Sequence, residues 1–88
     1  MHAVLVNVTI NDPEAAPKML EEQVVPRVSQ APGFVAGYWM RPQESKGWSV
    51  AVFESEQAAR AMADTVVSPP TGEVTVNNVD VQEIIASA

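Results

Sequence analysis

The sequence predicts an α+β domain in which two helices cover one face of a four-stranded antiparallel sheet. Two observations predict this class. Segments whose apolar residues alternate with a period of two are separated by segments whose apolar residues recur every four positions, in the order βαββαβ. Pro32-Gly33 then marks a helix end directly before an aromatic, β-prone run, and the strand-then-helix order returns later. The 88 residues suit one domain, which we expect to span 1–88.

The first predicted strand ends at Ile10 and has two different faces. Residues of one parity are apolar throughout: Val4, Val6, Val8 and Ile10. Because successive side chains of a strand point to opposite faces, we expect this face to meet the helices. The other parity contains Ala3, Leu5, Asn7 and Thr9. With Asn7 at its centre, that face suits a cavity wall or an interface.

The first predicted helix is interrupted by prolines. Asp12 is placed to cap it, and Pro17 would clash inside a helix, so we expect a short turn over 13–16 and the main helix from about residue 17. Pro26 is expected to bend this helix or to divide it into two segments. Its expected apolar face has a spacing of four: Leu20, Val24 and Val28.

The second and third strands form a predicted hairpin that leads into the second helix. We expect one strand to end near Arg41 and the next to run from Trp48 to Glu54, joined by a polar loop. Ser55 is a natural N-cap for the helix that follows. Ion pairs four residues apart are predicted on its exposed side: Glu56, Arg60 and Asp64.

The last strand changes phase in its middle. Val74 and Val76 share one parity and Val79 and Val81 share the other, which predicts a β-bulge at Asn77-Asn78. The complete order is the split βαβ plan of ferredoxin-like sandwiches. That plan leaves one sheet face without helices. Because large apolar residues occur at both parities of the strands, we expect this face to be an interaction surface, and a homodimer is the simplest partner.

Composition excludes several classes of function. Eleven acidic and five basic residues give a net charge of -6, which repels nucleic acid. There is no cysteine, so no disulfide or thiolate chemistry is expected. The N-terminal strand has no basic flank and is too short to cross a membrane, so we predict a soluble, cytoplasmic protein without membrane contact. One histidine and scattered acids give no metal-ligand set.

Several of these features together resemble the dimeric α+β barrel superfamily, specifically its antibiotic-biosynthesis-monooxygenase-like members. The shared features are Asn7 on the first strand, a helix that ends in Pro32-Gly33-Phe34, an aromatic second strand, and a third strand that runs into Phe53-Glu54-Ser55-Glu56. The resemblance implies a homodimer whose helix-free sheet faces close into a barrel. It also implies cofactor-independent oxygenation of phenolic polyketides or quinols, or oxygenation of haem.

The resemblance argues against the haem-degrading branch. That branch uses an Asn on the first strand, a Trp at the end of the third strand and a His on the second helix as the iron ligand. Asn7 matches, but Phe53 stands where the Trp would be, and residues 56–67 contain no histidine. Without an axial ligand the iron is not held, so we expect no haem and no other cofactor.

Oxygenation without a cofactor needs a dry pocket, a proton acceptor and donors for a developing oxyanion. Asn7 is a candidate amide donor, although strand asparagines also satisfy backbone groups or face interfaces. Tyr38 is a candidate hydrogen-bonding group or an interface aromatic. His2, the only histidine, is a candidate base or a frayed surface residue.

The strand register decides which residues accompany Asn7. If Arg41 pairs with Trp48, Tyr38 shares a face with Ala51 and Phe53, and we assign Asn7 to that face; a slip of one residue would exchange Tyr38 for Trp39. The expected substrate-binding residues are Leu5, Thr9, Phe34, Met40, Arg41, Ala51 and Phe53. The favoured function is a cofactor-independent monooxygenase acting on, or binding, a small aromatic or polyketide-like molecule. The alternative is a non-catalytic ligand-binding or scaffold dimer of the same fold.

Overall fold

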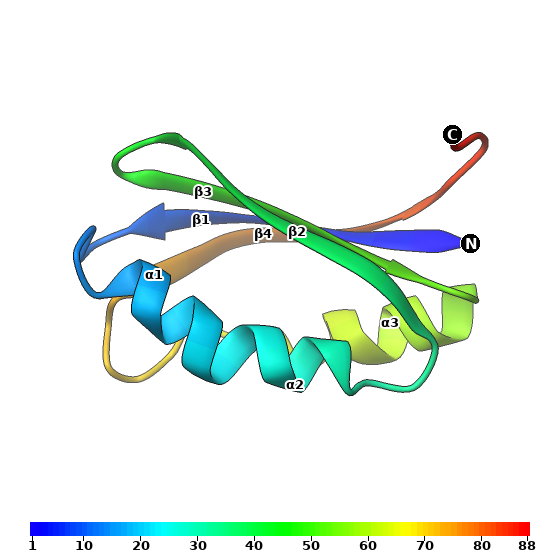
Figure 1. Ribbon diagram of the computed structural model, residues 1–88, viewed down its shortest axis with the longest axis horizontal. Coiled ribbons are helices and arrows are strands. Elements are labelled where there is room, and N and C mark those ends of the chain that lie inside the picture. The colour runs from blue at the N-terminus through cyan, green and yellow to red at the C-terminus, as the bar shows by residue number, and fades with distance from the viewer.

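The protein, described here by a computed structural model covering residues 1–88, contains one sheet with all its helices on one face (Figure 1). The four strands are ordered β2-β3-β1-β4, and all neighbours are antiparallel. This arrangement confirms the expected ferredoxin-like α+β fold. The elements are β1 (His2–Ile10), α1 (Ala16–Met19), the π-helical segment η1 (Leu20–Val24), α2 (Val25–Ser29), β2 (Phe34–Gln43), β3 (Lys46–Phe53), α3 (Glu56–Ala63) and β4 (Val74–Glu83).

The two faces of β1 differ as its alternation predicts. Val4 and Ile10 are buried under the helices, whereas Leu5 and Asn7 are exposed on the face that no helix covers. We call the first the covered face and the second the helix-free face. No helix combines the length and the apolar character that are needed to cross a membrane.

The first helix bends where Pro26 predicts, but its N-cap residue is Ala15, and Asp12 stabilises the turn before the helix in place of capping it. Asp12 Oδ1 accepts hydrogen bonds from the backbone N–H groups of Glu14 and Ala15, at 3.2 and 3.1 Å. Pro26 has no N–H group, and its ring would collide with the carbonyl four residues back in a regular α-helix. The chain avoids this by inserting η1, and the Val25 N–H donates to the Leu20 carbonyl, five residues back. The expected interruption is confirmed, and it takes the form of a π-helical turn.

The β2–β3 hairpin has the predicted register beside the turn, where Gln43 lies opposite Lys46, but an irregularity between Met40 and Gln43 shifts the remaining pairs by one residue. Met40, and not Arg41, lies opposite Trp48, and Tyr38 lies opposite Val50. The strands also extend to Gln43 and from Lys46, so the loop is a two-residue turn and not the longer polar loop that the sequence suggested. Pro42 is tolerated inside β2 because β2 is an edge strand, where a missing N–H leaves no partner unpaired.

The register corrects the expected grouping of site residues. Ala51 and Phe53 lie on the covered face and are buried, with Phe53 fully inaccessible. Tyr38 lies on the helix-free face, at 62% exposure. Placing Tyr38 and Asn7 together was right, but placing Ala51 and Phe53 with them was wrong. A one-residue slip is enough to cause this error because side chains alternate with a period of two.

The second helix, α3, has the predicted cap. Ser55 Oγ accepts a hydrogen bond from the Ala58 N–H at 3.1 Å. Of the expected ion pairs, only Glu56 and Arg60 form one, at 2.8 Å. The hydrogen bond from Arg60, together with its positive charge, lowers the pKa of the Glu56 carboxyl below its ordinary value of 4.5.

The bulge expected in β4 is present. Asn7 pairs with Asn78 and the next residue, Val8, pairs with Val76, so Asn77 is the extra residue. The bulge restores the phase of the strand: Val76 and Val79 both face the helices, where they pack beside the core.

The core beneath the sheet consists of two separate clusters. The larger gathers around Phe53 and the smaller around Ile10, at the other end of the sheet. The buried members of the larger cluster are Val4, Val28, Ala51, Phe53, Ala59 and Met62. Those of the smaller cluster are Ile10, Ala16, Met19 and Val74.

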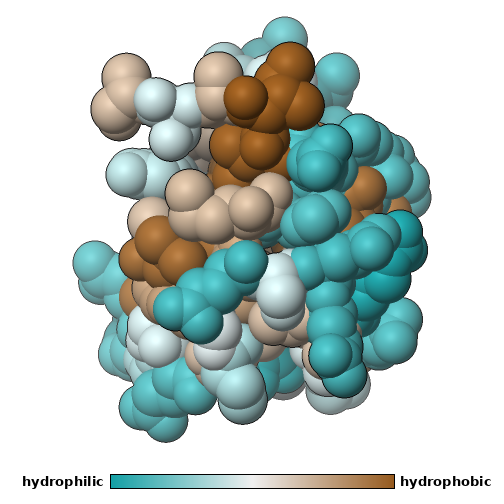
Figure 2. All heavy atoms as spheres, turned by 90° about the vertical axis from the view of Figure 1, so that its right-hand side faces the viewer, coloured by the Kyte–Doolittle hydropathy of each residue, from teal (hydrophilic) through white to brown (hydrophobic).

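The helix-free face is apolar on one half and polar on the other. The apolar half lies on β2, β3 and β1 and includes Leu5, Tyr38, Met40 and Trp48, all more than one-third exposed. On the polar half, Asn77 Nδ2 donates to Thr9 Oγ1 at 2.8 Å. Figure 2 shows the end of the molecule at which both termini lie. Hydrophobic side chains form patches on this surface, and one patch lies on the side of the sheet away from the helices.

Candidate functional site

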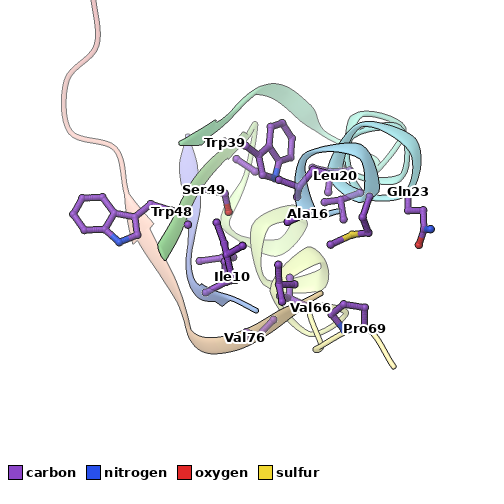
Figure 3. A pocket seen from close by; sticks show the side chains of 18 of the residues that line it. Ile10, Ala16, Leu20, Gln23, Trp39, Trp48, Ser49, Val66, Pro69 and Val76 are labelled. Carbon is purple, nitrogen blue, oxygen red and sulfur yellow. The ribbon is translucent and has the colours of Figure 1, made fainter. Parts of the chain in front are cut away.

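A cavity of ≈490 Å³ separates the sheet from the helices between the two core clusters. In Figure 3 the sheet contributes Ile10 and Ser49, the first helix contributes Leu20, and the segment after α3 contributes Val66 and Pro69. Of the 26 residues that line it, 18 are hydrophobic, and they come from both clusters. Its size and lining are those of a small-molecule site.

A cavity of this size is unusual in so small a core. Protein interiors are normally packed with few voids larger than a water molecule, because each missing contact costs stability. Here the lining includes buried residues of both clusters, among them Val4, Met62 and Ile10. The exposed side chains of Gln23, Arg27 and Arg41 also line it, so the cavity reaches the surface beside them.

Trp39 forms an aromatic wall of this cavity, on the β2 side (Figure 3). The glycine two residues earlier makes room for it. A Cβ atom at Gly37 would lie 2.9 Å from Trp39 Cη2, closer than real Cβ contacts come. Because Gly37 has no side chain, the indole can lie along the strand toward Phe34, whose Cε1 is 3.3 Å from the same position. Trp48 also belongs to the lining, but its indole points to the other side of the sheet (Figure 3).

The ionisable groups of the cavity are cations only. Arg27 and Arg41 line it, and no aspartate, glutamate, histidine, lysine or tyrosine does. Arg41 Nη1 donates a hydrogen bond to the Pro13 carbonyl at 3.2 Å, which ties β2 to the turn before α1. The remaining polar side chains of the lining are Gln23, Ser49 and the indoles of Trp39 and Trp48. The cavity can therefore bind an apolar body and an anionic or hydrogen-bonding group, but it supplies no general base.

Four of the predicted site residues lie on the helix-free face and not in this cavity: Leu5, Asn7, Thr9 and Tyr38. Asn7 and Leu5 line a shallower hollow of ≈270 Å³ there. The Asn7 amide oxygen is 3.5 Å from Asn77 Nδ2, so its nearest polar partner is the bulge of β4. The ligand-binding roles expected for these residues stay predictions, and they would require a ligand on the helix-free face.

The other predicted residues divide between cavity and core. Met40, Arg41 and Ala51 line the cavity. Phe34 and Phe53 pack edge to face beneath the sheet, with ring centroids 5.9 Å apart. His2 pairs with Phe53 at the far end of β1, and its Nδ1 atom is buried without a hydrogen-bond partner.

Sequence reasoning missed Ser49 and Arg27 as lining residues, and it named Trp39 only as the residue that a one-residue slip would bring in. The signal for Trp39 and Ser49 was the strand parity, which would have placed both on the covered face in the correct register. Arg27 follows one turn after Gln23 on the first helix, and nothing in the sequence separated it from an ordinary solvated charge.

Comparison with solved structures identifies proteins of the same fold. A variant of SnoaB, a cofactor-independent oxygenase from Streptomyces nogalater, superposes with a TM-score of 0.71 at 15% identity, covering 98% of this chain and 95% of that one. The heme-degrader MhuD from Mycobacterium tuberculosis, with two hemes in its active site, gives 0.57 at 22% identity, with coverages of 97% and 98%. A MhuD variant with two manganese protoporphyrin IX groups per active site gives 0.58 at 19% identity, with coverages of 98% and 97%.

No family model and no curated protein matches the chain. The likeness to the solved structures extends over nearly the whole chain, at identities that establish shared architecture. The fold that the sequence resemblance implied is thus confirmed: the chain shares the ferredoxin-like α+β fold of these solved structures.

Proposed function

We propose that this protein binds a small, largely apolar aromatic molecule in the cavity between the sheet and the first helix, and that it oxygenates this molecule without a cofactor. The observation that supports the proposal most directly is the ≈490 Å³ apolar cavity that divides the core. Trp39 offers the ring surface against which an aromatic ligand would stack. The shared fold with a cofactor-independent oxygenase favours the same class of chemistry.

The chemistry would rely on the ligand itself. An activated methylene between aromatic rings loses a proton, the resulting carbanion reduces O₂, and collapse of the peroxide gives a carbonyl and one water. The substrate supplies all the electrons, so no external reductant is needed. The protein's part is to hold the molecule in an apolar space and to stabilise the negative charge that develops on it. The lining provides two guanidinium groups and the Ser49 hydroxyl for that task.

The second candidate function is binding without chemistry, and one observation favours it. No residue of the lining can accept a proton at neutral pH, because its only ionisable side chains are Arg27 and Arg41. A catalytic role therefore needs a ligand that loses its proton to water. A carrier or scaffold protein has no such requirement.

Haem, the ligand in one of the two MhuD structures, does not fit the residues present. The only histidine, His2, lies at the start of β1 and is not part of the cavity lining. Helix α3 contains no histidine either. The cavity thus offers no axial histidine, cysteine or tyrosine for a haem iron.

The homodimer expected from the sequence is part of this proposal. Tyr38, Met40 and Trp48 expose large apolar side chains side by side on the helix-free face. Packing this face against a second copy would remove them from water. Most of the cavity lining lies on the opposite side of the sheet, and only Met40 and Trp48 belong both to the lining and to this face, so the interior of the cavity would stay accessible in such a dimer.

Oxygen uptake tests the proposal. The purified protein, with a chelator and no added flavin, is mixed with dihydroxyanthrone, a phenolic molecule with an activated methylene, and O₂ consumption is compared with the uncatalysed rate. We expect faster uptake, and we expect Ser49→Leu, which fills the cavity, to remove the acceleration. Binding without faster uptake would favour the non-catalytic function. Absence of binding would contradict both functions.

A further inference from the structure

The cavity has the opposite charge to the rest of the molecule. The chain carries eleven acidic and five basic residues, yet two of the basic residues and none of the acidic ones line the cavity. About two-thirds of all charged side chains in the protein are acidic, whereas both charged side chains of the lining are basic. The charge of the lining therefore differs in sign from the net charge of -6.

Neither arginine is neutralised by an acidic partner. The one ion pair of the structure joins Glu56 and Arg60 on the outer surface of α3. Arg41 gives one hydrogen bond to the Pro13 carbonyl, which leaves most of its five N–H donors free. Arg27 lies in the last turn of α2, one helical turn after Gln23, and has no ion-pair partner.

A guanidinium at the rim of an apolar cavity acts more strongly than one on a flat surface. Apolar walls exclude water and concentrate the field, so the charge is screened less. The planar donors of arginine also match the oxygens of a carboxylate, sulfonate or ionised phenol. An anionic group held at the rim would leave the rest of an aromatic molecule free to lie against Trp39.

We propose that the ligand of this cavity is an aromatic anion, whose charged oxygen group is held by Arg27 or Arg41 and whose rings occupy the apolar interior. This inference rests on the proposed function and defines its substrate class. Selectivity against neutral aromatics would come from the same two residues.

Arg41 also has a structural contact, and the protein as a whole is acidic. The hydrogen bond to Pro13 gives Arg41 a structural task that needs no ligand. The net charge of -6 repels anions at long range. A preference for anions would therefore appear only if the local effect of the arginines exceeds the global one.

A matched pair of probes separates charge from shape. Anilinonaphthalene sulfonate and phenylnaphthylamine share the same aromatic body, and only the first carries a negative charge. Their dissociation constants are measured by fluorescence titration at pH 7 for the wild type and for Arg27→Gln, Arg41→Gln and Arg41→Lys. Arg60→Gln is the control, because it removes a cation that lies outside the cavity. Circular dichroism checks that each variant is folded.

We expect the wild type to bind the sulfonate more tightly than the uncharged amine. At least one glutamine variant should weaken sulfonate binding by about fivefold, as expected for a partly exposed charge pair, and leave the amine unchanged. Arg41→Lys and Arg60→Gln should keep the preference. Equal binding of both probes by the wild type, or equal losses for both probes in the arginine variants, would overturn the inference alone. If neither probe binds, the proposed function fails and this inference fails with it.

Discussion

The two faces of the sheet treat their hydrophobic residues in different ways. On the covered face Phe53 is fully inaccessible, whereas Trp48, on the same strand but on the other face, is 50% exposed. The covered face nevertheless leaves a cavity between its two clusters. The helix-free face has large apolar residues without anything to cover them. One face thus has space for a ligand inside the protomer, and the other has a surface that suits a second protomer.

This difference separates two functions that the sequence analysis had placed on one face. A ligand pocket and a dimer interface make opposite demands, since one must stay open and the other must close. Because the sheet assigns them to opposite faces, a substitution on one face should change one function and leave the other intact. The variants below test that separation.

The largest effect is expected from Phe53→Ala on the covered face. Removing a fully buried ring that packs edge to face with Phe34 should lower the free energy of unfolding by about 3–5 kcal/mol. Urea denaturation measures it. Leu5→Ala, on the helix-free face of β1, is the control and should lose clearly less at concentrations where the protein is monomeric. Equal losses from the two variants would contradict the assignment of Phe53 to the core.

Trp48→Asp should break the proposed dimer. A charge in place of a central aromatic residue of the interface should raise the dimer dissociation constant by about 30-fold or more, while the protomer stays folded. Sedimentation equilibrium measures this constant. Gln57→Asp adds the same charge on the exposed surface of α3 and should have no effect. A wild-type protein that is monomeric at all accessible concentrations would refute the interface.

Ser49→Leu should separate ligand binding from dimerisation. The larger apolar side chain extends into the cavity, so binding of uncharged phenylnaphthylamine should weaken by about tenfold, and the protein should be stabilised by about 1 kcal/mol because a void is filled. Val50→Leu is the neighbouring control on the helix-free face. If both variants bind the amine equally well, the cavity is not its site.

The smallest effect on stability is expected from a substitution on the outer surface of α3, which belongs to neither face of the sheet. The pKa of Glu56 is lower in the folded protein than in the unfolded chain, because Glu56 forms an ion pair with Arg60. This ion pair therefore stabilises the protein at a pH above the unfolded-state pKa. The stabilisation is lost as the pH falls through the folded-state pKa. Glu56→Gln should therefore melt slightly below the wild type at pH 7. The difference should shrink below pH 4.5 and then vanish. A difference that grows in acid would have the wrong sign.

Local sequence features predicted most of the fold. Ser55 could be recognised as a cap, and Asp12 as part of the turn before the first helix, because their hydrogen bonds depend on neighbours in the sequence. The bulge at Asn77 was visible because it changes the phase of the valines along a single strand. The π-helical turn before Pro26 was foreseen only as an interruption, since a proline excludes the regular hydrogen bond without choosing its replacement.

The candidate site was less predictable because it depends on how separate elements meet. The pairing of Met40 with Trp48 in place of Arg41 places Trp39 in the cavity and Tyr38 outside it. The register shift between Met40 and Gln43 causes this pairing, and nothing in the sequence indicated that shift. The cavity itself arises from the distance between two clusters of apolar side chains. Each of those side chains looks like an ordinary core residue in the sequence.

The central claim is that a ligand binds on the covered face, and the two tryptophans allow it to be tested directly. Trp39 lines the cavity and Trp48 lies on the helix-free face, and the chain has no other tryptophan. Their indole N–H signals in a two-dimensional NMR spectrum, assigned with Trp39→Phe and Trp48→Phe, report the two faces separately. Titration with phenylnaphthylamine should shift the Trp39 signal and leave that of Trp48 in place. A shift of the Trp48 signal alone would contradict the account.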